Sequence, residues 1–361
     1  MFVKLEARAE SSRAMAYLAP VLAVAFTLLG GSLLFAFLGF NPLDALYAFF
    51  IAPLSSVYGL TEWALKATPL ALIAAGLAIG FRANVWNIGA EGQLTLGGIF
   101  GGGVALWAYD AAPTASAWWL VPLMLVIGAV GGLLWAALPA FLKTRFNANE
   151  ILTSLMLTYV ATLLLSYLVH GPWRDPDGFN FPESRVFQDA ALLPTLIENT
   201  RLSWGFPLAI LLVSLCWLLL ARGFVGFQIR VVGLSPRAAS YAGFSQKKLT
   251  WFCLLLSGGL AGLAGGMEVA GPIGQLQPSI SPGYGFTAII VAFLGRLHPL
   301  GILLAAALMA LSYLGGETAQ ITLGLPLAVT GVFQGMLLFF LLATDVLILY
   351  RVRWTGLQGS A

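Results

Sequence analysis

The sequence predicts an all-α polytopic membrane protein with about ten transmembrane helices. Of its 361 residues, 59% are apolar and only 9% are charged, whereas a soluble domain carries about 25% charged residues. The mean hydropathy is +0.90. Because so few charges cannot cover a water-facing surface of this size, lipid must surround most of the chain. The net charge of +3, with the basic residues scattered, argues against a nucleic-acid partner.

Ten apolar segments reach or approach the roughly 20 residues that a helix needs to cross the hydrocarbon core. They centre near Ala25, Ala71, Gly101, Val130, Tyr159, Leu212, Leu256, Ile290, Ala307 and Leu338. The segments around Gly101 and Ile290 are interrupted by glycine and polar residues. Residues 42–60 are apolar but contain prolines, so we expect a short re-entrant or interfacial helix there.

The distribution of basic residues predicts the orientation in the membrane. With the N-terminus inside and ten crossings, only Lys66, Arg174, Arg185 and Arg201 of the 18 Lys and Arg lie outside. The uncharged residues 14–40 exceed the roughly 7–15 residues of a signal-peptide core, so they are expected to form a retained first helix. We expect N-in and C-in topology and one membrane domain, 1–361, with a cytoplasmic N-terminus (1–13), an external loop (171–203) and a basic cytoplasmic loop (222–248).

The chain lacks the motifs of an enzyme. It contains no Gly-Lys-Ser/Thr sequence, so it is not expected to bind or hydrolyse ATP by itself. Cys216 and Cys253 lie in apolar runs and are interpreted as small buried hydrophobic residues. No metal spacing or catalytic set is present, so no cofactor is expected in this chain.

Two apolar segments are broken by glycine and polar residues, one in each half of the chain. Asn87, Glu91 and Gln93 interrupt the first, and Ser281-Pro282-Gly283-Tyr284-Gly285 interrupts the second. Transporters often place broken helices at corresponding positions of two repeats, around the substrate path. An internal repeat is therefore possible, and the polar residues either line the path or satisfy one another at a structural break.

Glycines also recur at helical spacing. Gly258, Gly262 and Gly266 are four residues apart, as are Gly128 and Gly132. Such faces let helix backbones approach closely. We expect tight packing within the helix bundle, with a subunit interface as the alternative.

Three motifs resemble the permeases of the branched-chain amino acid, ribose and nucleoside class of ABC importers. They are residues 87–93 (NIGAEGQ), 258–266 (GGLAGLAGG) and 283–295 (GYGFTAIIVAFLG), and the resemblance extends from about residue 65 to 342. It implies a type II importer-like permease in a bacterial inner membrane. In that family two permeases form the pore, two cytoplasmic ATPases that bind ATP and Mg²⁺ drive it, and an external binding protein delivers the solute.

Further motifs look more like nucleoside importers than ribose or branched-chain amino acid importers. They are residues 81–93 (FRANVWNIGAEGQ) and 149–157 (NEILTSLML), followed by the long external segment. The resemblance implies a nucleoside or nucleobase as cargo and a second, non-identical permease. Two alternatives stay open: a ribose-like sugar permease, or an ion-coupled secondary transporter using Glu91 or Glu268.

The expected substrate path is lined by Asn87, Glu91 and Gln93 from one half of the chain and by Ser281 and Tyr284 from the other. These amides and hydroxyls, with one carboxylate, suit an uncharged hydrogen-bonding solute rather than an ion. Few contacts are expected, because a path fed by a binding protein should hold its cargo weakly.

The cytoplasmic loop should contain the helix that couples the pore to the ATPase. Ser235 is a good N-cap and Pro236 a good first helical residue. Ala238 and Ala239 continue the helix, and Gly243 can adopt the left-handed conformation that ends it.

The external loop should help to dock the binding protein through Arg174, Arg185 and Arg201, which stand among acidic residues. Mixed charges suit a reversible contact that sets orientation and association rate. A solvated loop with internal ion pairs is the alternative.

Overall fold

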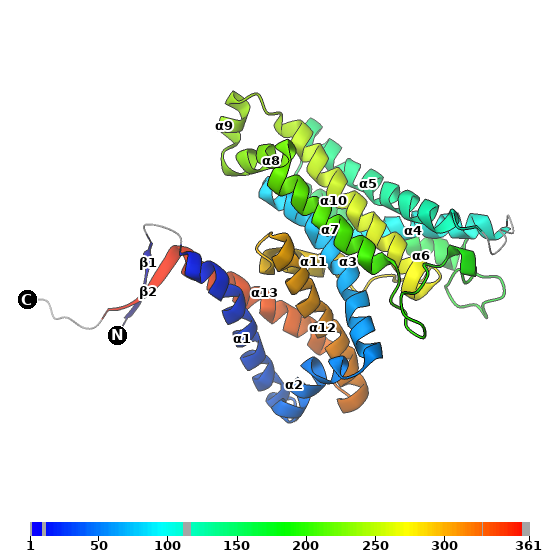
Figure 1. Ribbon diagram of the computed structural model, residues 1–361, viewed down its shortest axis with the longest axis horizontal. Helices are drawn as coiled ribbons and strands as arrows, with labels where there is room; N and C mark the ends of the chain where they lie inside the picture. Colours follow the sequence, from blue (N-terminus) through cyan, green and yellow to red (C-terminus); the bar gives the residue numbers. More distant parts are fainter. Residues whose placement is uncertain (1, 9–11, 111–116, 327, 356–361) are drawn as a thin grey trace, which may run out of the picture. The chain divides into compact units, whose positions relative to one another are not determined.

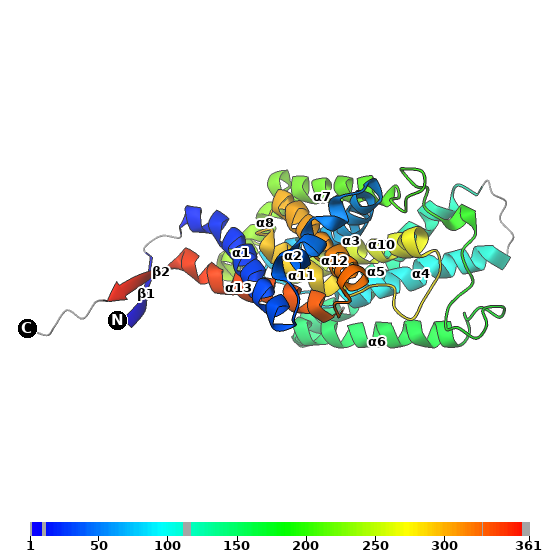
Figure 2. The ribbon, with the colours of Figure 1, turned by 90° about the horizontal axis from the view of Figure 1, so that it is seen from below.

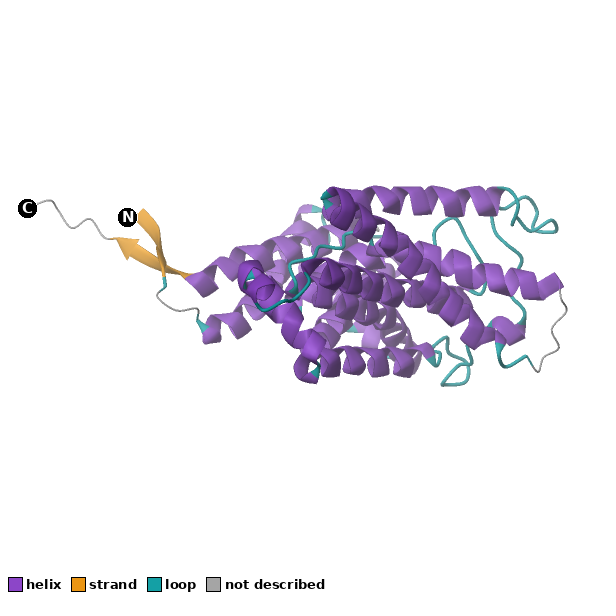
Figure 3. Cartoon of the chain, turned by 90° about the horizontal axis from the view of Figure 1, so that it is seen from above, coloured by secondary structure: helices purple, strands orange, loops and turns teal. Residues whose placement is uncertain are grey.

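The computed structural model describes residues 2–8, 12–110, 117–326 and 328–355, and most of them are helical (Figures 1 and 3). Among these described residues, eight helices are long and apolar enough to cross a membrane. The prediction of an all-α polytopic membrane protein is therefore confirmed. The chain forms two compact units, Ser56–Ala310 and Met1–Ser55 with Leu311–Ala361. The single membrane domain expected from the sequence stays a prediction.

The larger unit contains the elements that hold the candidate site. They are α3 (Val57–Arg82), α4 (Ala90–Asp110), α5 (Leu120–Phe146), α6 (Glu150–His170), α7 (Gly205–Arg222), α8 (Phe224–Leu234), α9 (Pro236–Tyr241), α10 (Gln246–Glu268) with a π turn (Val269–Ile273), α11 (Tyr284–Leu294) and the first part of α12 (Pro299–Leu323). A short 3₁₀ turn, Asp189–Ala191, lies in the loop between α6 and α7. Within this unit, α9 and residues 171–203 lie at opposite ends (Figure 1).

Helices α4, α5 and α10 pack against one another through glycine (Figure 2). A Cβ atom built on Gly262 would lie 2.5 Å from the carbonyl oxygen of Gly128 and 2.7 Å from Cα of Gly132. The backbones of α5 and α10 therefore touch directly, as small-xxx-small faces allow. This geometry favours packing within the bundle over a subunit interface for the spaced glycines.

The two apolar segments that the sequence shows as interrupted, around Gly101 and Ile290, form helices of different length. The segment around Gly101 forms a full helix, α4, of 21 residues. The segment around Ile290 forms only the 11 residues of α11, which span about 16 Å of a hydrocarbon core about 30 Å thick. This segment is therefore shorter than a full crossing, in line with the interruption by glycine and polar residues that its sequence shows. Pro282 and Gly283, where φ is +98°, keep the preceding residues out of the helix.

The smaller unit contains β1 (Phe2–Ala7), α1 (Arg13–Phe37), α2 (Pro42–Phe50), a 3₁₀ turn (Ala52–Leu54), the end of α12, α13 (Ala328–Leu349) and β2 (Tyr350–Thr355). Its core includes the rings of Phe35, Phe49 and Phe333, whose centroids lie 5.0–5.8 Å apart. Residues 42–60, expected to form one short helix, are divided. α2 ends at residue 50, and α3 starts at residue 57 because the Ser56 side chain caps it by accepting from the Gly59 amide at 3.0 Å.

The two ends of the chain form an antiparallel pair of strands. Residue 2 of β1 lies opposite residue 355 of β2, and residue 7 lies opposite residue 350. The sequence had indicated only a cytoplasmic tail at residues 1–13. The pairing brings the two termini together.

Candidate functional site

The N-termini of the two helices that follow the breaks, α4 and α11, meet inside the larger unit. The amide of Gly285 donates to Oε2 of Glu91 at 2.6 Å. A Cβ atom on Gly285 would collide with the backbone at Ala90 and Glu91. The backbones of two segments nearly 200 residues apart in the sequence are thus in direct contact. The sequence predicted that both broken segments lie around one path, but it did not predict this contact.

Glu91 is placed where two helix dipoles favour a negative charge. It stands in the first turn of α4 and also faces the first turn of α11, and each helix N-terminus carries about half a positive charge. The hydroxyl of Ser281 accepts from the amides of Gly283 at 3.1 Å and Tyr284 at 2.9 Å. The protein's own groups therefore satisfy amides that would otherwise form an anion site.

Asn87 and Gln93 form a buried amide pair. Nδ2 of Asn87 donates to Oε1 of Gln93 at 2.7 Å, and Nε2 of Gln93 donates to Oδ1 of Asn87 at 3.0 Å. Asn87 also donates to the Ser257 hydroxyl of α10 at 3.0 Å. The residues are only 3% and 1% exposed. This geometry matches the structural alternative, in which the polar groups at the break satisfy one another.

The five residues assigned to the path are thus brought into one region, with Tyr284 buried as well. Asn87 and Gln93 hold the break, and Glu91 and Ser281 hold the start of α11. Contact between these side chains and a solute stays a prediction.

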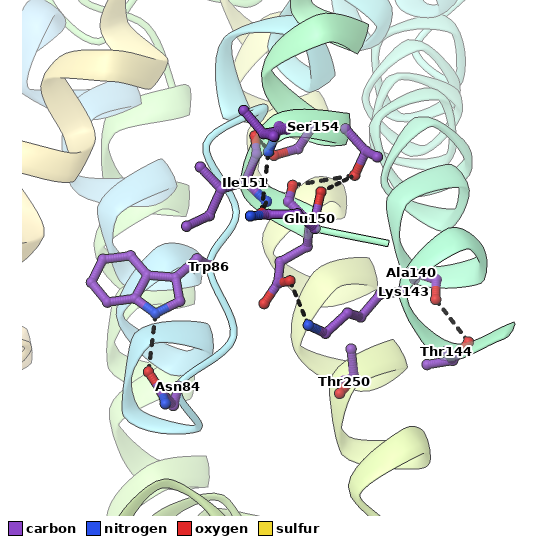
Figure 4. A network of polar contacts seen from close by, with 12 residues as sticks. Asn84, Trp86, Ala140, Lys143, Thr144, Glu150, Ile151, Ser154 and Thr250 are labelled. Carbon is purple, nitrogen blue, oxygen red and sulfur yellow. Dashed lines mark hydrogen bonds and ion pairs between the residues drawn. The ribbon is translucent and has the colours of Figure 1, made fainter. Parts of the chain in front are cut away.

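The second motif, residues 149–157, packs against the first. The hydroxyl of Ser154 in α6 accepts from the amide of Ile88 at 3.2 Å (Figure 4). A Cβ atom on Gly89 would lie 2.7 Å from the Ser154 carbonyl oxygen. Glu150 forms an ion pair with Lys143 of α5 at 2.8 Å (Figure 4). The sequence did not predict this contact, and the polar Ser154 within an apolar helix was the available signal.

Residues 222–248 contain the short helix that the sequence predicted. The Ser235 hydroxyl accepts from the Ala238 amide at 3.4 Å, Pro236 begins α9, and Gly243 has φ of +77° just beyond its end. Ala239 is fully buried, while Tyr241 is 95% exposed. The helix and its caps are confirmed, and its role in coupling stays a prediction.

This loop is connected to the break before α4. A Cβ atom on Gly233, at the end of α8, would collide with the carbonyl oxygen of Arg82, the last residue of α3. The Arg82 guanidinium in turn donates to the Leu297 carbonyl oxygen at 2.8 Å. Residues 83–89 therefore begin where α8 contacts the end of α3.

All three arginines that the sequence assigned to docking have partners within the chain. Nε of Arg201 donates to Oε1 of Glu62 at 2.9 Å, and the second guanidinium nitrogen bonds the other carboxylate oxygen. Hydrogen bonding to this carboxylate raises the pKa of Arg201. Glu62 is only 3% exposed. The sequence analysis did not identify it as a partner of Arg201. Arg174 donates to Asn180 at 2.6 Å, and Arg185 lies 5.1 Å above the Tyr109 ring.

Both cysteines, Cys216 and Cys253, are buried and form no disulfide, as expected from their apolar surroundings. Within residues 2–8, 12–110, 117–326 and 328–355, no group of three His, Cys, Asp or Glu side chains is arranged to hold a metal ion.

Comparison with known proteins decides the family. Residues 59–342 match the sequence model of one protein family, the permease component of branched-chain amino acid transport systems. The chain belongs to this permease family. The permease is 37% identical to a glucose ABC transporter permease protein of Haloferax volcanii, over 94% of this chain and 90% of the relative. It is 29% identical to a guanosine ABC transporter permease protein of Bacillus subtilis (90% and 92%) and 28% identical to a nucleoside ABC transporter permease protein of Lactococcus lactis (90% and 90%).

Proposed function

We propose that this permease carries a nucleoside or nucleobase as the membrane subunit of an ATP-driven importer. The proposal rests on the junction where the N-termini of α4 and α11 meet, because the Glu91 carboxylate offsets the positive ends of both helices there. Glu91 occupies the position between two helix N-termini that an anionic solute would need. The junction therefore suits a neutral solute, which includes nucleosides, nucleobases and sugars.

The contact between the two nucleoside-like motifs supports a nucleoside over a sugar. Residues 81–93 and 149–157 act as one packed unit through Ser154 and Ile88, so their shared resemblance concerns one structural region. The relatives from Bacillus and Lactococcus are named for guanosine and nucleosides. A simple sugar is the second candidate, because the Haloferax relative, at 37% identity, is named for glucose.

The proposed partners follow from the two ends of the larger unit. A cytoplasmic ATPase, which would bind ATP and Mg²⁺, contacts α9, and an extracytoplasmic binding protein docks on residues 171–203. A second, non-identical permease completes the pore. We also propose N-in and C-in topology in a bacterial inner membrane. The pairing of β1 with β2 supports termini on the same side, as an even number of crossings requires.

The cargo is tested by uptake. Cells that lack the gene are expected to lose accumulation of labelled uridine or adenosine, while uptake of labelled ribose and glucose is retained. Complementation with the gene should restore nucleoside uptake. Loss of sugar uptake with intact nucleoside uptake would transfer the assignment to the second candidate.

A bulky residue on the exposed face of α9 is expected to uncouple ATP hydrolysis from transport. Ala238 is exposed and Ala239 fully buried, so Ala238→Trp should disturb the ATPase contact and leave the loop folded. We expect about a tenfold fall in solute moved per ATP hydrolysed, within the usual range of coupling energies. Reconstituted transporter in proteoliposomes gives both rates.

Two matched variants control for this effect. Ala238→Ser keeps the size of the exposed side chain and should behave as the wild type. Ala239→Trp places the same bulk in the packed side of α9 and should instead lower the yield of folded protein. An unchanged ratio of transport to hydrolysis in Ala238→Trp would count against α9 as the coupling helix.

A further inference from the structure

Helix α6 packs on the broken motif with one face and leaves its opposite face uncovered. Cβ atoms built on Gly89 and Gly92 would each lie 2.7 Å from backbone atoms of α6, at Ser154 and Thr158. Figure 2 shows α6 along one edge of the larger unit, beside α4 and α5. The opposite face, here called the outer face of α6, consists of residues three or four positions apart. All of them are 54–70% exposed: Leu152, Met156, Tyr159, Leu163 and Tyr167.

Tyr159 lies at the middle of the outer face. It is nine residues from the first residue of α6 and eleven from the last, so about 13 Å of helix separates it from the nearer end. This distance is close to half of a hydrocarbon core about 30 Å thick. The ring is therefore far from the headgroup level that tyrosine prefers in membrane proteins.

The Tyr159 hydroxyl forms no hydrogen bond within the part of the chain that the structure describes. Other exposed hydroxyls in the spans bond to their own helix: Thr162 donates to the Thr158 carbonyl oxygen at 3.1 Å, and Ser214 donates to that of Ile210 at 2.8 Å. The tyrosine ring holds its hydroxyl too far from the backbone of α6 for such a bond. In hydrocarbon the group would stay unsatisfied, which is costly, whereas water or a polar solute would satisfy it.

Helix α5 provides a comparison on the same unit. The exposed residues along its length from 126 to 141 are all apolar: Val126, Val130, Leu134, Leu138 and Phe141. This composition suits contact with lipid, because no side chain there needs a hydrogen bond. The outer face of α6 differs at its centre, where α5 has aliphatic side chains and α6 has a phenol.

We propose that the outer face of α6 borders a water-filled solute path, and that Tyr159 contacts the cargo in it. The inference rests on the proposed function, in which the path lies between this chain and a second permease. Asn87 and Gln93 satisfy each other inside the unit, so the solute must find other partners. The Tyr159 ring offers a planar base a stacking surface that tolerates different bases, and the hydroxyl offers one hydrogen bond. A single platform of this kind holds its cargo weakly.

Labelling of an introduced cysteine tests whether water reaches the outer face. Tyr159→Cys is compared with Leu134→Cys in membrane vesicles that contain the complete transporter. Leu134 is the matched control, because it lies fourteen residues from the start of α5, twelve from its end, and is 53% exposed. The thiolate is the reacting form and apolar surroundings suppress it, so a charged methanethiosulfonate should label Tyr159→Cys at least about tenfold faster. The wild type, with Cys216 and Cys253 buried, gives the background.

The labelling result does not depend on which solute is carried. If Tyr159→Cys reacts no faster than Leu134→Cys, the outer face lies against lipid or a dry subunit interface, and the proposal is overturned. If Tyr159→Cys is labelled but the transporter carries glucose and no nucleoside, the proposed function fails and the path along α6 stands. Reaction of both variants after denaturation in detergent shows that each thiol is present.

Uptake by two further variants tests contact with the cargo. Tyr159→Leu removes the stacking surface at an exposed position and should lower nucleoside uptake about fivefold or more, at a normal level of folded protein. Tyr159→Phe keeps the ring and should retain more uptake than Tyr159→Leu. Wild-type nucleoside uptake by Tyr159→Leu would overturn the contact between this ring and the cargo.

Discussion

Gly262→Ala is expected to destabilise the permease strongly, although it adds a single methyl group. The new Cβ atom would lie 2.5 Å from the Gly128 carbonyl oxygen and 2.7 Å from Cα of Gly132, so α5 and α10 must separate. Backbone atoms cannot rotate away as a side chain can, so we expect at least the roughly 1–3 kcal/mol typical of an overpacked core. Thermal melting of the detergent-purified protein and its yield measure the effect.

Gly259 supplies a matched control on the same helix. A Cβ atom there has no neighbour nearer than 3.9 Å, so Gly259→Ala should be tolerated. It should even gain stability, because alanine is about 0.5–1 kcal/mol more favourable than glycine within a helix. Equal melting temperatures for the two variants would contradict the direct backbone contact between α5 and α10.

Removal of the Glu91 carboxylate is expected to abolish most transport. In Glu91→Ala the buried amide of Gly285 loses its acceptor, a change that costs about 1–3 kcal/mol. The N-termini of α4 and α11 also lose the negative charge between them. A loss of about 1–3 kcal/mol corresponds to a factor of about 5–150 in an equilibrium between two conformations. If the junction takes part in the conformational change of transport, uptake should fall by about that factor. Initial rates of solute uptake into proteoliposomes give the measurement.

Glu91→Gln separates hydrogen bonding from charge. The glutamine carbonyl oxygen can still accept from Gly285, so this variant should fold as the wild type and keep more transport than Glu91→Ala. Wild-type uptake by Glu91→Ala, at normal protein levels, would show that the junction takes no part in translocation.

The long helices were predictable because each depends on one uninterrupted apolar run. Helices such as α1, α5 and α7 lie where the ten expected segments lay. The break before α11 was visible in the sequence as Pro282 and Gly283, but the sequence did not show that the helix after the break has only 11 residues. The β1–β2 pair was missed because it joins residue 2 to residue 355. A pairing over that separation has no local pattern in either strand.

The candidate site likewise has some features that the sequence predicted and others that it did not. The caps of α9, Ser235 and Gly243, were predictable because capping chemistry involves neighbours only a few residues apart. The partners of Glu91 in α11 and of Ser154 at residue 88 depend on helix packing. Sequence patterns identified these polar residues as unusual within apolar segments, yet they did not show which groups would satisfy them.

The ion pair between Glu62 and Arg201 has a consequence for the biogenesis of the protein. The two residues are 139 positions apart, so α3 leaves the ribosome long before Arg201 is synthesised. At about 5–20 residues per second, the delay is roughly 7 to 28 s. During that interval a helix destined for the centre of the unit, with a carboxylate near its start, must wait beside the insertion machinery or at the membrane surface. Depletion of insertion factors should therefore affect α3 before the more lipid-exposed helices.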